Sequence, residues 1–419
     1  MIWYIFPAIG GPGLGRYWRG YHLAQAWQNA GARPIVIGPG YHHYFQRNTP
    51  LSGTHRIGGV TYHFIPTKRY GRQALDRLRA ILSFGVGLMI DRELAKLART
   101  HRPDVIVYSS PYPFGYLAAH RLARRYKAAL VFEVRDLWPL SLTELLGLAS
   151  WHPFVLAAGA CERIAYATAD RVVSLLPHAD AHMIKRGLDA GRFAYIPNGV
   201  ALQGGQNTSC TVDTPLLKRA RSLAAEGRFL IVHAGNMSMT TNLAPLIEAA
   251  KLLQDRGITK IVMLMVGRGE AETALKEQAR ALQLSNMEFF SQVDKTDVTE
   301  LLRLAHGGFA ALTPSPIYRF GSSLNKVLDY MLAGLPIVFA CDCSPNMVEQ
   351  AGAGVTVSPV DPVGLAAALT RLADLPVSER AAMGARGRAF VEKEHEYGLL
   401  GRKYMNLFAD IRPLVFARH

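Results

Sequence analysis

The chain has 419 residues, of which 49% are hydrophobic and 19% are charged, a composition that excludes an intrinsically disordered protein. A single hydrophobic core rarely serves so long a chain, so two domains of roughly 200 residues each are expected. The net charge of +15 is concentrated in residues 1–200, which hold 24 Lys and Arg against 11 Asp and Glu, whereas residues 201–419 hold 23 against 21. Only the first half is therefore expected to meet an extended anionic partner.

The N-terminal segment Met1–Pro7 is apolar and has neither a basic region nor a cleavage-site pattern, so it indicates a first β-strand rather than a signal peptide. The longest apolar run, Ala80–Ile90, has about half of the roughly 20 residues that a membrane-spanning helix requires. We therefore expect a cytoplasmic protein.

Short apolar segments rich in Val, Ile and Phe alternate with segments of helical periodicity through the first 200 residues. The predicted strands are Ile2–Phe6, Pro34–Ile37, Thr61–Ile65, Val105–Tyr108, Ala129–Glu133 and Arg171–Leu175. The predicted helices between them include Tyr17–Ala30, Asp91–Arg99 and Gly115–Tyr126. This alternation predicts a parallel sheet that is covered by helices on both faces.

The alternation stops at Ile196-Pro197-Asn198-Gly199-Val200, and the polar, Gly-rich segment 202–214 is typical of a linker. It resumes with the predicted strands Phe229–Ala234, Ile261–Val266, Met287–Phe290, Gly308–Leu312 and Ile337–Ala340. We therefore predict an α/β protein with two Rossmann-like domains, residues 1–200 and 201–399, which face each other across a ligand-binding cleft. The last helical segment, from about residue 378 to 409, is long enough for residues 400–419 to pack back on the first domain.

A glycine-rich loop, residues 10–15, follows the first predicted strand and precedes the first helix. Glycines such as Gly11 and Gly13 at this position let backbone N–H groups approach a phosphate. The spacing differs from the dinucleotide-binding pattern G-x-G-x-x-G, and no acidic residue closes the second strand, so an NAD enzyme is not expected. The alternative is a tight turn that binds no ligand.

The segment Phe132–Pro139 ends the fifth predicted strand with Arg135 and Asp136. Both charged side chains are therefore expected at the carboxyl edge of the sheet. There the carboxylate could orient a sugar hydroxyl or take part in proton transfer, and the guanidinium could counter a phosphate. The alternative is an Arg–Asp ion pair that only ends the strand.

Residues 314–336 combine a polar loop with a helix and a helix-ending Gly334-Leu335-Pro336. Ser322 or Ser323 is expected to cap this helix, so that the N–H groups of its first turn would point at a bound diphosphate.

Four polar side chains gather around the start of the same helix. Asn325 and Lys326 fall in its first turn and suit phosphate oxygens, and Arg319 precedes them in the loop. Asp329 lies three residues past Lys326, on the same helix face, and could accept hydrogen bonds from both ribose hydroxyls. A purely structural role does not explain this combination.

The four cysteines are Cys161, Cys210, Cys341 and Cys343. Their spacing fits neither a disulfide framework nor a zinc knuckle, because no His or Cys lies close to Cys341-Asp342-Cys343. Reduced thiols without a bound metal are expected.

Five basic residues precede the apolar run of residues 80–90: Lys68, Arg69, Arg72, Arg77 and Arg79. This combination suits a helix that lies on an anionic membrane surface, where each basic side chain contributes about 1 kcal/mol. The alternative is a core-facing helix with a solvated basic flank. The charge of the first half favours the inner face of the cytoplasmic membrane as a partner, with an anionic lipid-linked saccharide as acceptor.

Several of these motifs together resemble those of bacterial family-four glycosyltransferases, in particular the branch that builds lipopolysaccharide O-antigen, capsule and exopolysaccharide. The similar motifs are Arg135-Asp136-Leu137-Trp138-Pro139, Ile196-Pro197-Asn198-Gly199-Val200, Ala234-Gly235-Asn236 and Asn325-Lys326 through Asp329-Tyr330-Met331-Leu332-Ala333-Gly334. The similarity extends in order over nearly the whole chain.

The resemblance implies a GT-B fold, with the nucleotide-sugar donor bound by the second domain and the acceptor by the first. It also implies transfer of a hexosyl or N-acetylhexosaminyl group with retention of configuration and without a metal or other cofactor. UDP is the expected nucleotide, with GDP and ADP left open. Because the leaving phosphate can serve as the base, no protein nucleophile is required.

The residues expected at this site fall into four groups. The catalytic residues are Asp136, Arg135 and Lys326. The donor diphosphate is assigned to Arg319, Lys326, Asn325, Asn236, Gly11 and Gly13. The ribose and base are assigned to Asp329, Gly267, Glu270 and Val293, and the donor sugar to Ser322 and Ser323.

The sequence departs from the family pattern at the donor site. The wider family has two glutamates eight residues apart, whereas here Gly321 and Asp329 occupy these positions. Arg135 stands in place of the usual His, and Asn236 stands where many members carry an arginine for phosphate. These differences place more weight on Arg319 and Lys326.

Two other functions are considered. A non-hydrolysing nucleotide-sugar epimerase would share the fold but needs acids and bases around the sugar, and Gly321 disfavours it. A nucleic-acid-binding protein would explain the sequence pI of about 9.7. No basic–aromatic ladder is present, however, and the charge is confined to one half, so no nucleic-acid partner is expected.

Overall fold

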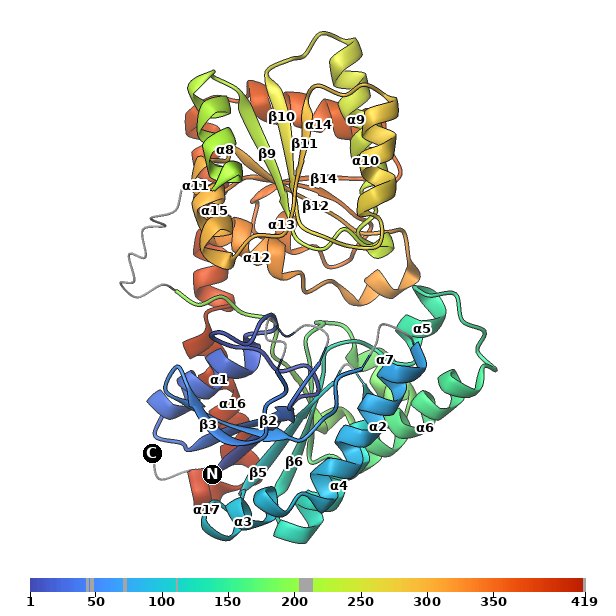
Figure 1. Ribbon diagram of the computed structural model, residues 1–419, viewed down its shortest axis with the longest axis vertical. Helices are drawn as coiled ribbons and strands as arrows, with labels where there is room; N and C mark the ends of the chain where they lie inside the picture. Colours follow the sequence, from blue (N-terminus) through green and yellow to red (C-terminus); the bar gives the residue numbers. More distant parts are fainter. Residues whose placement is uncertain (43–44, 46–48, 71–73, 111, 203–213, 417–419) are drawn as a thin grey trace. The chain divides into compact units, whose positions relative to one another are not determined.

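The computed structural model describes residues 1–42, 45, 49–70, 74–110, 112–202 and 214–416 and divides into two compact units (Figure 1). The first unit comprises Met1–Ala201 and Tyr397–His419, and the second comprises Leu202–Glu396. Both units are α/β with a largely parallel sheet, as predicted. The expected linker lies almost wholly outside the described residues, and so does Cys210. Within the described ranges, no helix is long and apolar enough to cross a membrane.

The first unit contains an eight-stranded sheet. Its strands are β1 (Ile2–Ile5), β2 (Pro34–Pro39), β3 (Gly53–Ile57), β4 (Val60–Ile65), β5 (Val105–Ser109), β6 (Ala129–Val134), β7 (Arg171–Ser174) and β8 (Phe193–Tyr195). They lie in the order β3-β4-β2-β1-β5-β6-β7-β8, and every neighbouring pair is parallel except β3–β4. The direction of strand addition reverses between β1 and β5, which is where ligands bind in open α/β sheets.

Helices cover both faces of this sheet. They are α1 (Arg19–Asn29), α2 (Ala74–Ile90), α3 (Arg92–Thr100), α4 (Tyr116–Tyr126), α5 (Leu140–Glu144), α6 (Pro153–Thr168), α7 (Asp180–Lys185), α16 (Tyr397–Ile411) and α17 (Pro413–Phe416). Successive side chains of a strand point to opposite faces. Tyr4 of β1 accordingly packs against Trp27 of α1, whereas Trp3 packs against Tyr126 of α4.

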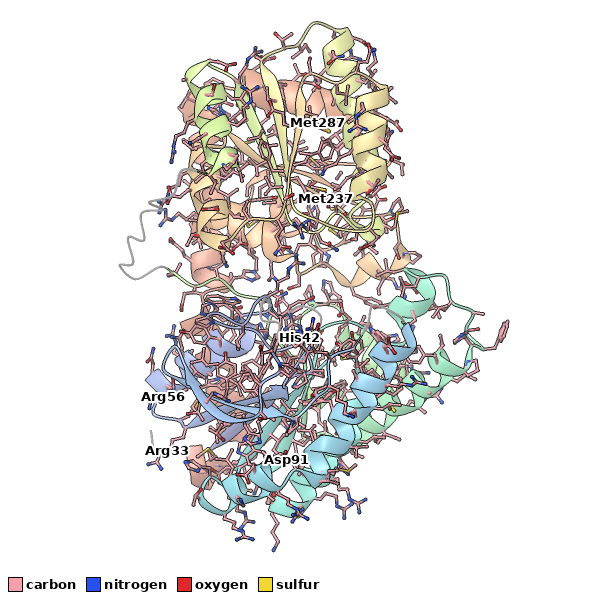
Figure 2. The ribbon with its side chains drawn as sticks, viewed as in Figure 1. Arg33, His42, Arg56, Asp91, Met237 and Met287 are labelled. Carbon is pink, nitrogen blue, oxygen red and sulfur yellow. The ribbon has the colours of Figure 1, made fainter. Side chains whose placement is uncertain are left out.

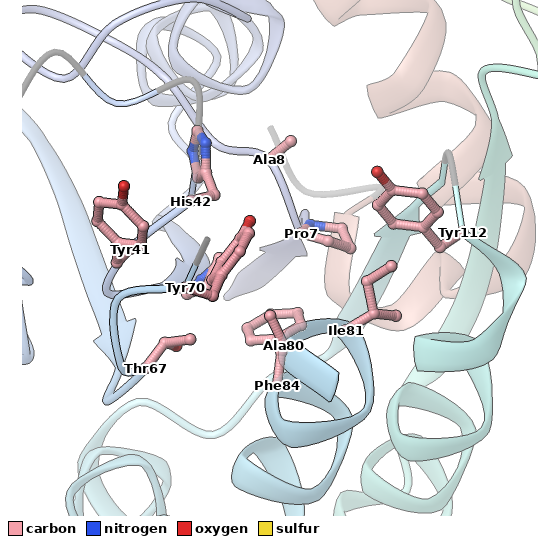
Figure 3. Close-up of a pocket in the computed structure, with 11 residues that line it drawn as sticks. Pro7, Ala8, Tyr41, His42, Thr67, Tyr70, Ala80, Ile81, Phe84 and Tyr112 are labelled. Carbon is pink, nitrogen blue, oxygen red and sulfur yellow. The ribbon is translucent and has the colours of Figure 1, made fainter. Parts of the chain in front are cut away.

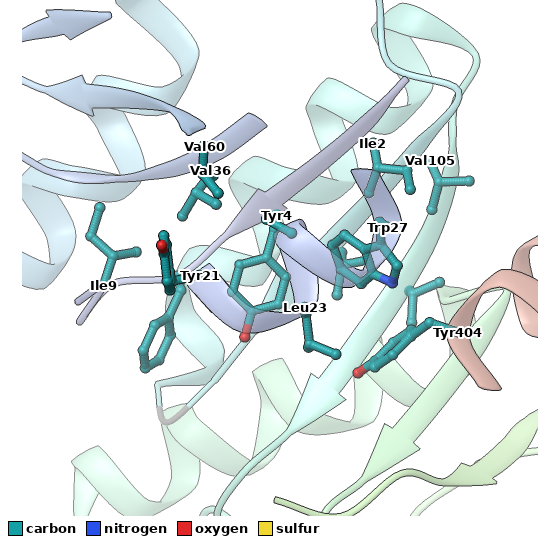
Figure 4. Close-up of a cluster of buried hydrophobic side chains, with 14 of the residues drawn as sticks. Ile2, Tyr4, Ile9, Tyr21, Leu23, Trp27, Val36, Val60, Val105 and Tyr404 are labelled. Atoms are coloured by element: carbon teal, nitrogen blue, oxygen red, sulfur yellow. The ribbon is translucent and has the colours of Figure 1, made fainter. Parts of the chain in front are cut away.

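The core on the α1 side is rich in aromatic side chains (Figure 4). Trp27 lies 5.4 Å from Tyr404 of α16, measured between ring centroids, so the C-terminal helix completes this core. Gly401 of α16 faces Ala26 of α1, and a Cβ added at Gly401 would come within 2.5 Å of the Ala26 Cβ. Glycine therefore allows the two helices to approach closely.

The second unit contains a six-stranded, wholly parallel sheet. Its strands are β9 (Phe229–Ala234), β10 (Ile261–Val266), β11 (Met287–Phe290), β12 (Gly307–Ala311), β13 (Ile337–Ala340) and β14 (Gly354–Val357). Their order is β11-β10-β9-β12-β13-β14, so the direction of strand addition reverses between β9 and β12. Met237 and Met287 belong to its buried core (Figure 2).

The helices of the second unit flank this sheet. They are α8 (Pro215–Ala225), α9 (Ala244–Asp255), α10 (Glu272–Ala281), α11 (Lys295–Leu304), α12 (Asn325–Leu332), α13 (Met347–Gln350), α14 (Pro362–Asp374) and α15 (Val377–Glu394). The single helix expected over about 378–409 is in fact two, α15 and α16. The helical run breaks at residues 395–396, where the Tyr397 N–H donates to the Val200 carbonyl at 3.1 Å.

Candidate active site

A buried histidine and a lysine meet at the carboxyl edge of the second sheet, where β9 and β12 adjoin. His233 of β9 is fully buried, and its Nδ1 lies 3.3 Å from the Phe309 carbonyl of β12. Its Nε2 lies 3.4 Å from Nζ of Lys326, the second residue of α12. Nδ1 faces an acceptor and therefore carries the ring proton, which leaves Nε2 to accept a hydrogen bond from the ammonium group.

The electrostatics agree with this assignment. Burial and the Lys326 charge lower the pKa of His233 well below its usual value, so the imidazole is neutral at pH 7. Burial also lowers the pKa of Lys326 to about 8, which keeps the lysine mostly protonated at neutral pH. The lysine is thus held by a neutral group that leaves its charge uncompensated.

Glycine at position 235 makes room for this lysine. A Cβ added at Gly235 would lie 3.0 Å from Cε and 3.2 Å from Nζ of Lys326. Gly267, which follows β10, packs against the same turn, and its Cβ would come within 1.8 Å of the Gly235 carbonyl oxygen. The ends of β9 and β10 therefore pack backbone to backbone beneath the lysine, with the Asn236 side chain exposed beside them.

Helix α12 begins at Asn325, and the capping expected from Ser322 or Ser323 is wrong. The N-cap position is Leu324, which is extended and makes no side-chain cap. Gly321 turns the chain at φ +88°, which places both serines ahead of the helix, and Ser322 is buried with its Oγ 3.8 Å from Cys343 Sγ. The leucine at the N-cap cannot accept a hydrogen bond from the first-turn N–H groups of α12, so such groups at this position suit an anion.

The other predicted donor residues surround this helix start at different depths. Asp329, one turn further along α12, lies 3.6 Å from Nζ of Lys295. This contact brings the β11–α11 connection, which contains the half-buried Val293, to the side of α12. Arg319 is exposed, stacks 4.3 Å from the Phe320 ring and donates to the Pro316 carbonyl.

The Glu270 side chain binds a backbone N–H group of a neighbouring loop. Its carboxylate accepts a hydrogen bond from the Met239 N–H at 3.2 Å and so ties the β10–α10 loop to the segment after β9. The second unit thus brings together the predicted residues at the ends of β9 and β10 and at the start of α12.

Gly11 and Gly13 lie in the first unit, apart in the chain from these residues. The Leu14 N–H donates to the Gly11 carbonyl at 3.0 Å, and the Tyr62 hydroxyl donates to the Gly10 carbonyl at 2.9 Å. Helix α1 begins only at Arg19, so the glycine loop is a folded turn and not the first turn of a helix.

Arg135 and Asp136 follow β6 and point to different surroundings. The Arg135 guanidinium lies over the rings of Phe6 and Tyr17, at 4.7 and 5.4 Å from their centroids. Its buried Nη1 has no hydrogen-bond partner among the described residues. Asp136 is exposed, and no Arg135–Asp136 ion pair joins them in the ranges that the structure describes. The guanidinium is therefore held by aromatic rings, which leaves its hydrogen-bonding capacity for a ligand.

The sequence interpretation missed a buried carboxylate at Glu133. Its Oε2 accepts hydrogen bonds from Arg19 Nε at 3.0 Å and from the Tyr404 hydroxyl. Its Oε1 accepts from the hydroxyls of Tyr4 at 2.8 Å and Ser109 at 2.6 Å. Burial opposes ionisation, but the charges of Arg19 and Arg135 outweigh it and lower the pKa of Glu133.

Arg19 extends this network to the chain segment that leaves the first unit. It donates to the Ile196 carbonyl at 3.0 Å and to the Pro197 carbonyl. The network around the Arg19–Glu133 ion pair thus joins β1, β5, β6, α1 and α16 to residues 196–197, where the predicted alternation stops. No sequence signal could have found it, because its members are distant in the chain: the hydrogen-bonded residues Tyr404 and Glu133 alone are 271 positions apart.

The first unit also contains an open, shallow pocket lined by aromatic side chains at the carboxyl ends of β1, β2 and β4 (Figure 3). Its lining includes Tyr41, His42, Tyr70, Phe84 and Tyr112. The rings of Tyr41 and Tyr70 meet edge to face at 5.5 Å. Aromatic faces with a few polar groups are well suited to bind a sugar ring.

Comparison with known proteins finds that each half of the chain is similar to a glycosyltransferase domain family. Residues 13–199 match the family described as glycosyl transferase 4-like domain, and residues 228–374 match glycosyl transferases group 1. A curated relative is the GDP-mannose-dependent monoacylated alpha-(1-6)-phosphatidylinositol monomannoside mannosyltransferase of Corynebacterium glutamicum. It is 26% identical over 151 residues, which cover 35% of this chain and 38% of that protein.

Solved structures match over nearly the full length. Anabaena Alr3699/HepE in complex with UDP-glucose has a TM-score of 0.66 and 15% identity over 98% of this chain and 100% of that chain. WaaG, a glycosyltransferase involved in lipopolysaccharide biosynthesis, has a TM-score of 0.65 and 15% identity over 97% and 99%. Sucrose-phosphate synthase from Thermosynechococcus elongatus reaches 0.71 with 14% identity over 99% of both chains. The fold is therefore GT-B, as the sequence resemblance implied.

Proposed function

We propose that this chain, which carries two glycosyltransferase domains, transfers a sugar from a nucleoside-diphosphate sugar to a lipid-linked saccharide or polysaccharide precursor. The observation that carries the proposal is the cation at the start of α12. Lys326 lies 3.4 Å from a neutral histidine, beside the glycine ends of two strands and an uncapped helix N-terminus. Such an arrangement suits the β-phosphate of a nucleotide.

The same residues explain how a leaving diphosphate is stabilised. Negative charge develops on the phosphate as the bond to the sugar breaks. Lys326, the first-turn N–H groups of α12 and Arg319 then provide fixed positive charge. We propose that they do so without a metal ion or other cofactor, with retention of configuration, and with the leaving phosphate accepting the proton of the acceptor hydroxyl. Asp136 and Arg135 are proposed to act on the acceptor.

The proposed contacts to the ribose, base and sugar are based on where the residues lie around the start of α12. Asp329 and the loop of Val293 are proposed to bind the ribose and base, together with Gly267 and Glu270. Ser322, Ser323 and the backbone at Gly321 are proposed to bind the transferred hexosyl or N-acetylhexosaminyl group. UDP is the proposed nucleotide, in line with the UDP-glucose bound by Alr3699/HepE, although the Corynebacterium relative is GDP-mannose-dependent.

The acceptor is proposed to bind the first unit. The tyrosine-lined pocket offers ring faces for a saccharide, and the unpartnered Nη1 of Arg135 offers a donor for an anionic group. A lipid-diphosphate-linked saccharide has both features. We propose that this acceptor is a precursor of O-antigen, capsule or exopolysaccharide.

Peripheral binding to the inner face of the cytoplasmic membrane is part of the same proposal. Helix α2 has features of both a core-facing helix and an interfacial helix. It buries Phe84 and Leu88 in the core, and it exposes Leu82, Val86 and Ile90 by 50%, 49% and 70%. Helix α4 packs against both α2 and α6 and so joins them into one layer.

The same layer exposes further apolar and basic side chains. Leu117 of α4 and Leu156 of α6 are exposed. Lys68 and Arg69 before α2 are also exposed, and so is Arg79 within α2. Arg72 and the Arg77 side chain lie outside the described residues. Exposed apolar side chains with neighbouring cations are typical of an interfacial surface.

A thermal-shift panel of UDP, GDP, ADP and NAD, each with and without Mg²⁺, tests the proposal. A ligand at about 100 times its dissociation constant adds roughly 2.7 kcal/mol and raises the melting temperature by several degrees. A metal-independent shift by one nucleoside diphosphate is expected. A shift with NAD alone, or with none of the diphosphates, would rule the donor proposal out. Salt-sensitive binding to anionic liposomes but not to DNA is expected for the membrane proposal.

A further inference from the structure

Two thiols that the proposed reaction does not use lie beside the predicted donor-sugar residues. Cys341 and Cys343 directly follow β13, are 3% and 8% exposed, and place their Sγ atoms 3.0 Å apart. A disulfide has an S–S distance of about 2.05 Å, so a movement of about 1 Å would join the two sulfurs.

The polar surroundings distinguish the two thiols. A hydrogen bond from the Cys341 thiol, together with one from Ser322, lowers the pKa of Cys343. The same contact and burial raise the pKa of Cys341, whose Sγ also accepts from Asn346 Nδ2 at 3.6 Å. Cys343 is thus the thiolate that reacts first, and Cys341 is the neighbour that can resolve its product.

We propose that Cys341 and Cys343 form an oxidisable dithiol site next to the donor sugar, whose oxidation to a disulfide weakens donor binding. With a peroxide as oxidant, the Cys343 thiolate attacks one oxygen, an S–O bond forms, and the O–O bond breaks. The Cys341 thiol then attacks this sulfur, the S–S bond forms, and the S–O bond breaks. Two thiols are oxidised, and hydrogen peroxide is reduced to two water molecules.

Two contacts transmit the change to the donor site. Cys343 Sγ lies 3.8 Å from the Ser322 hydroxyl, and a disulfide draws that sulfur away from the serine. The Ser344 N–H donates to the Tyr318 carbonyl at 3.1 Å, which ties the cysteine loop to the segment that carries Arg319. This consequence rests on the proposed function, whereas the chemistry of the two thiols does not.

The test treats the full-length protein with a small excess of hydrogen peroxide and maps its thiols by mass spectrometry. A Cys341–Cys343 disulfide is expected to form before Cys161 is modified, because burial raises the pKa of Cys161. The affinity for UDP-glucose, measured by calorimetry, is expected to fall about fivefold, as for the loss of one hydrogen bond to the sugar, and to recover with dithiothreitol. The Cys343→Ser variant lacks the thiolate that reacts first, so its donor affinity is expected to be the same before and after peroxide treatment.

Each outcome decides one part of the proposal. If both thiols remain free to alkylation after Cys161 has been oxidised, the dithiol site is wrong. If the disulfide forms and the affinity for UDP-glucose is unchanged, or if Cys343→Ser loses affinity in peroxide to the same extent, the link to the donor site is wrong. If the reduced protein binds no nucleoside diphosphate, the proposed function fails, and the thiol map still decides whether the disulfide forms.

Discussion

The two units use charge at the carboxyl edges of their sheets in opposite ways. In the first unit, Glu133 and Arg19 are 0% and 2% exposed and satisfy each other with the help of three hydroxyl groups. In the second unit, Lys326 contacts a neutral histidine, and no carboxylate pairs with it among the described residues. A buried charge with a complete set of partners fixes the architecture, whereas a cation held by a neutral group keeps its charge for a ligand.

The largest effect is expected from breaking the buried pair. Glu133→Gln keeps the shape of the side chain but leaves the Arg19 guanidinium without a counter-charge. Removal of one partner of a buried ion pair typically costs about 3–5 kcal/mol. We expect a loss of this size in the unfolding free energy, measured by denaturant titration followed through the tryptophans. All five of them lie in the first unit: Trp3, Trp18, Trp27, Trp138 and Trp151.

A matched control is available on the surface. Glu93→Gln also removes a carboxylate from an ion pair, with Lys96 at 2.7 Å, but both side chains are more than 60% exposed. Its expected effect on the unfolding free energy is much smaller, because solvent screens an exposed ion pair. Equal losses in the two variants would show that the Glu133 pair is not a structural element of the first unit.

The next effect concerns turnover. Lys326→Ala removes the cation and is expected to lower the rate of sugar transfer about 100-fold, the value of a hydrogen bond to a charged group, while the melting temperature without ligand is retained. Lys218→Ala, on the exposed side of α8, is the matched control and is expected to behave as the unaltered protein. If Lys326→Ala transfers the sugar at an unchanged rate, Lys326 does not bind the donor diphosphate.

Much of the fold was accessible from the sequence because buried parallel strands are continuous apolar runs. The exceptions were β3, β8 and β14. Strand β3 has the polar sequence GTHRI, is exposed along its middle and pairs antiparallel at the sheet edge, so it shows neither a buried run nor a clear alternation. The break between α15 and α16 was also missed, because it depends on the backbone contact of Tyr397 with Val200.

Candidate site residues could be predicted from the sequence only where they are neighbours in the chain. Asn325, Lys326 and Asp329 lie within two turns of one helix, so their spacing was informative. His233 lies 93 positions before Lys326, inside an apolar strand, and looks like an ordinary core histidine. The serine cap was wrong because the turn at Gly321 shifts the helix start, which local propensity alone does not specify.

The pH dependence of donor binding tests whether the charge of Lys326 serves the ligand. Burial lowers the pKa of Lys326 to about 8, and a bound diphosphate favours the charged form and raises that pKa. The charge is present below pH 8 and is lost above it. Affinity for the donor, measured by calorimetry, is therefore expected to be nearly constant below pH 7 and about tenfold weaker at pH 9. Lys326→Arg stays charged and is expected to show a flat profile.

The smallest expected effect tests whether His233 positions the lysine or only fills the core. His233→Leu preserves volume but removes the acceptor for Lys326 Nζ, so donor affinity is expected to fall about fivefold, as for one lost hydrogen bond. The Phe309 carbonyl keeps a second donor, the Tyr330 hydroxyl at 3.3 Å, so the sheet itself loses little. His233→Gln offers an amide oxygen and is expected to restore part of the affinity. Equal affinity in the Leu variant and the unaltered protein would assign His233 to packing alone and leave Lys326 positioned by Gly235 and α12.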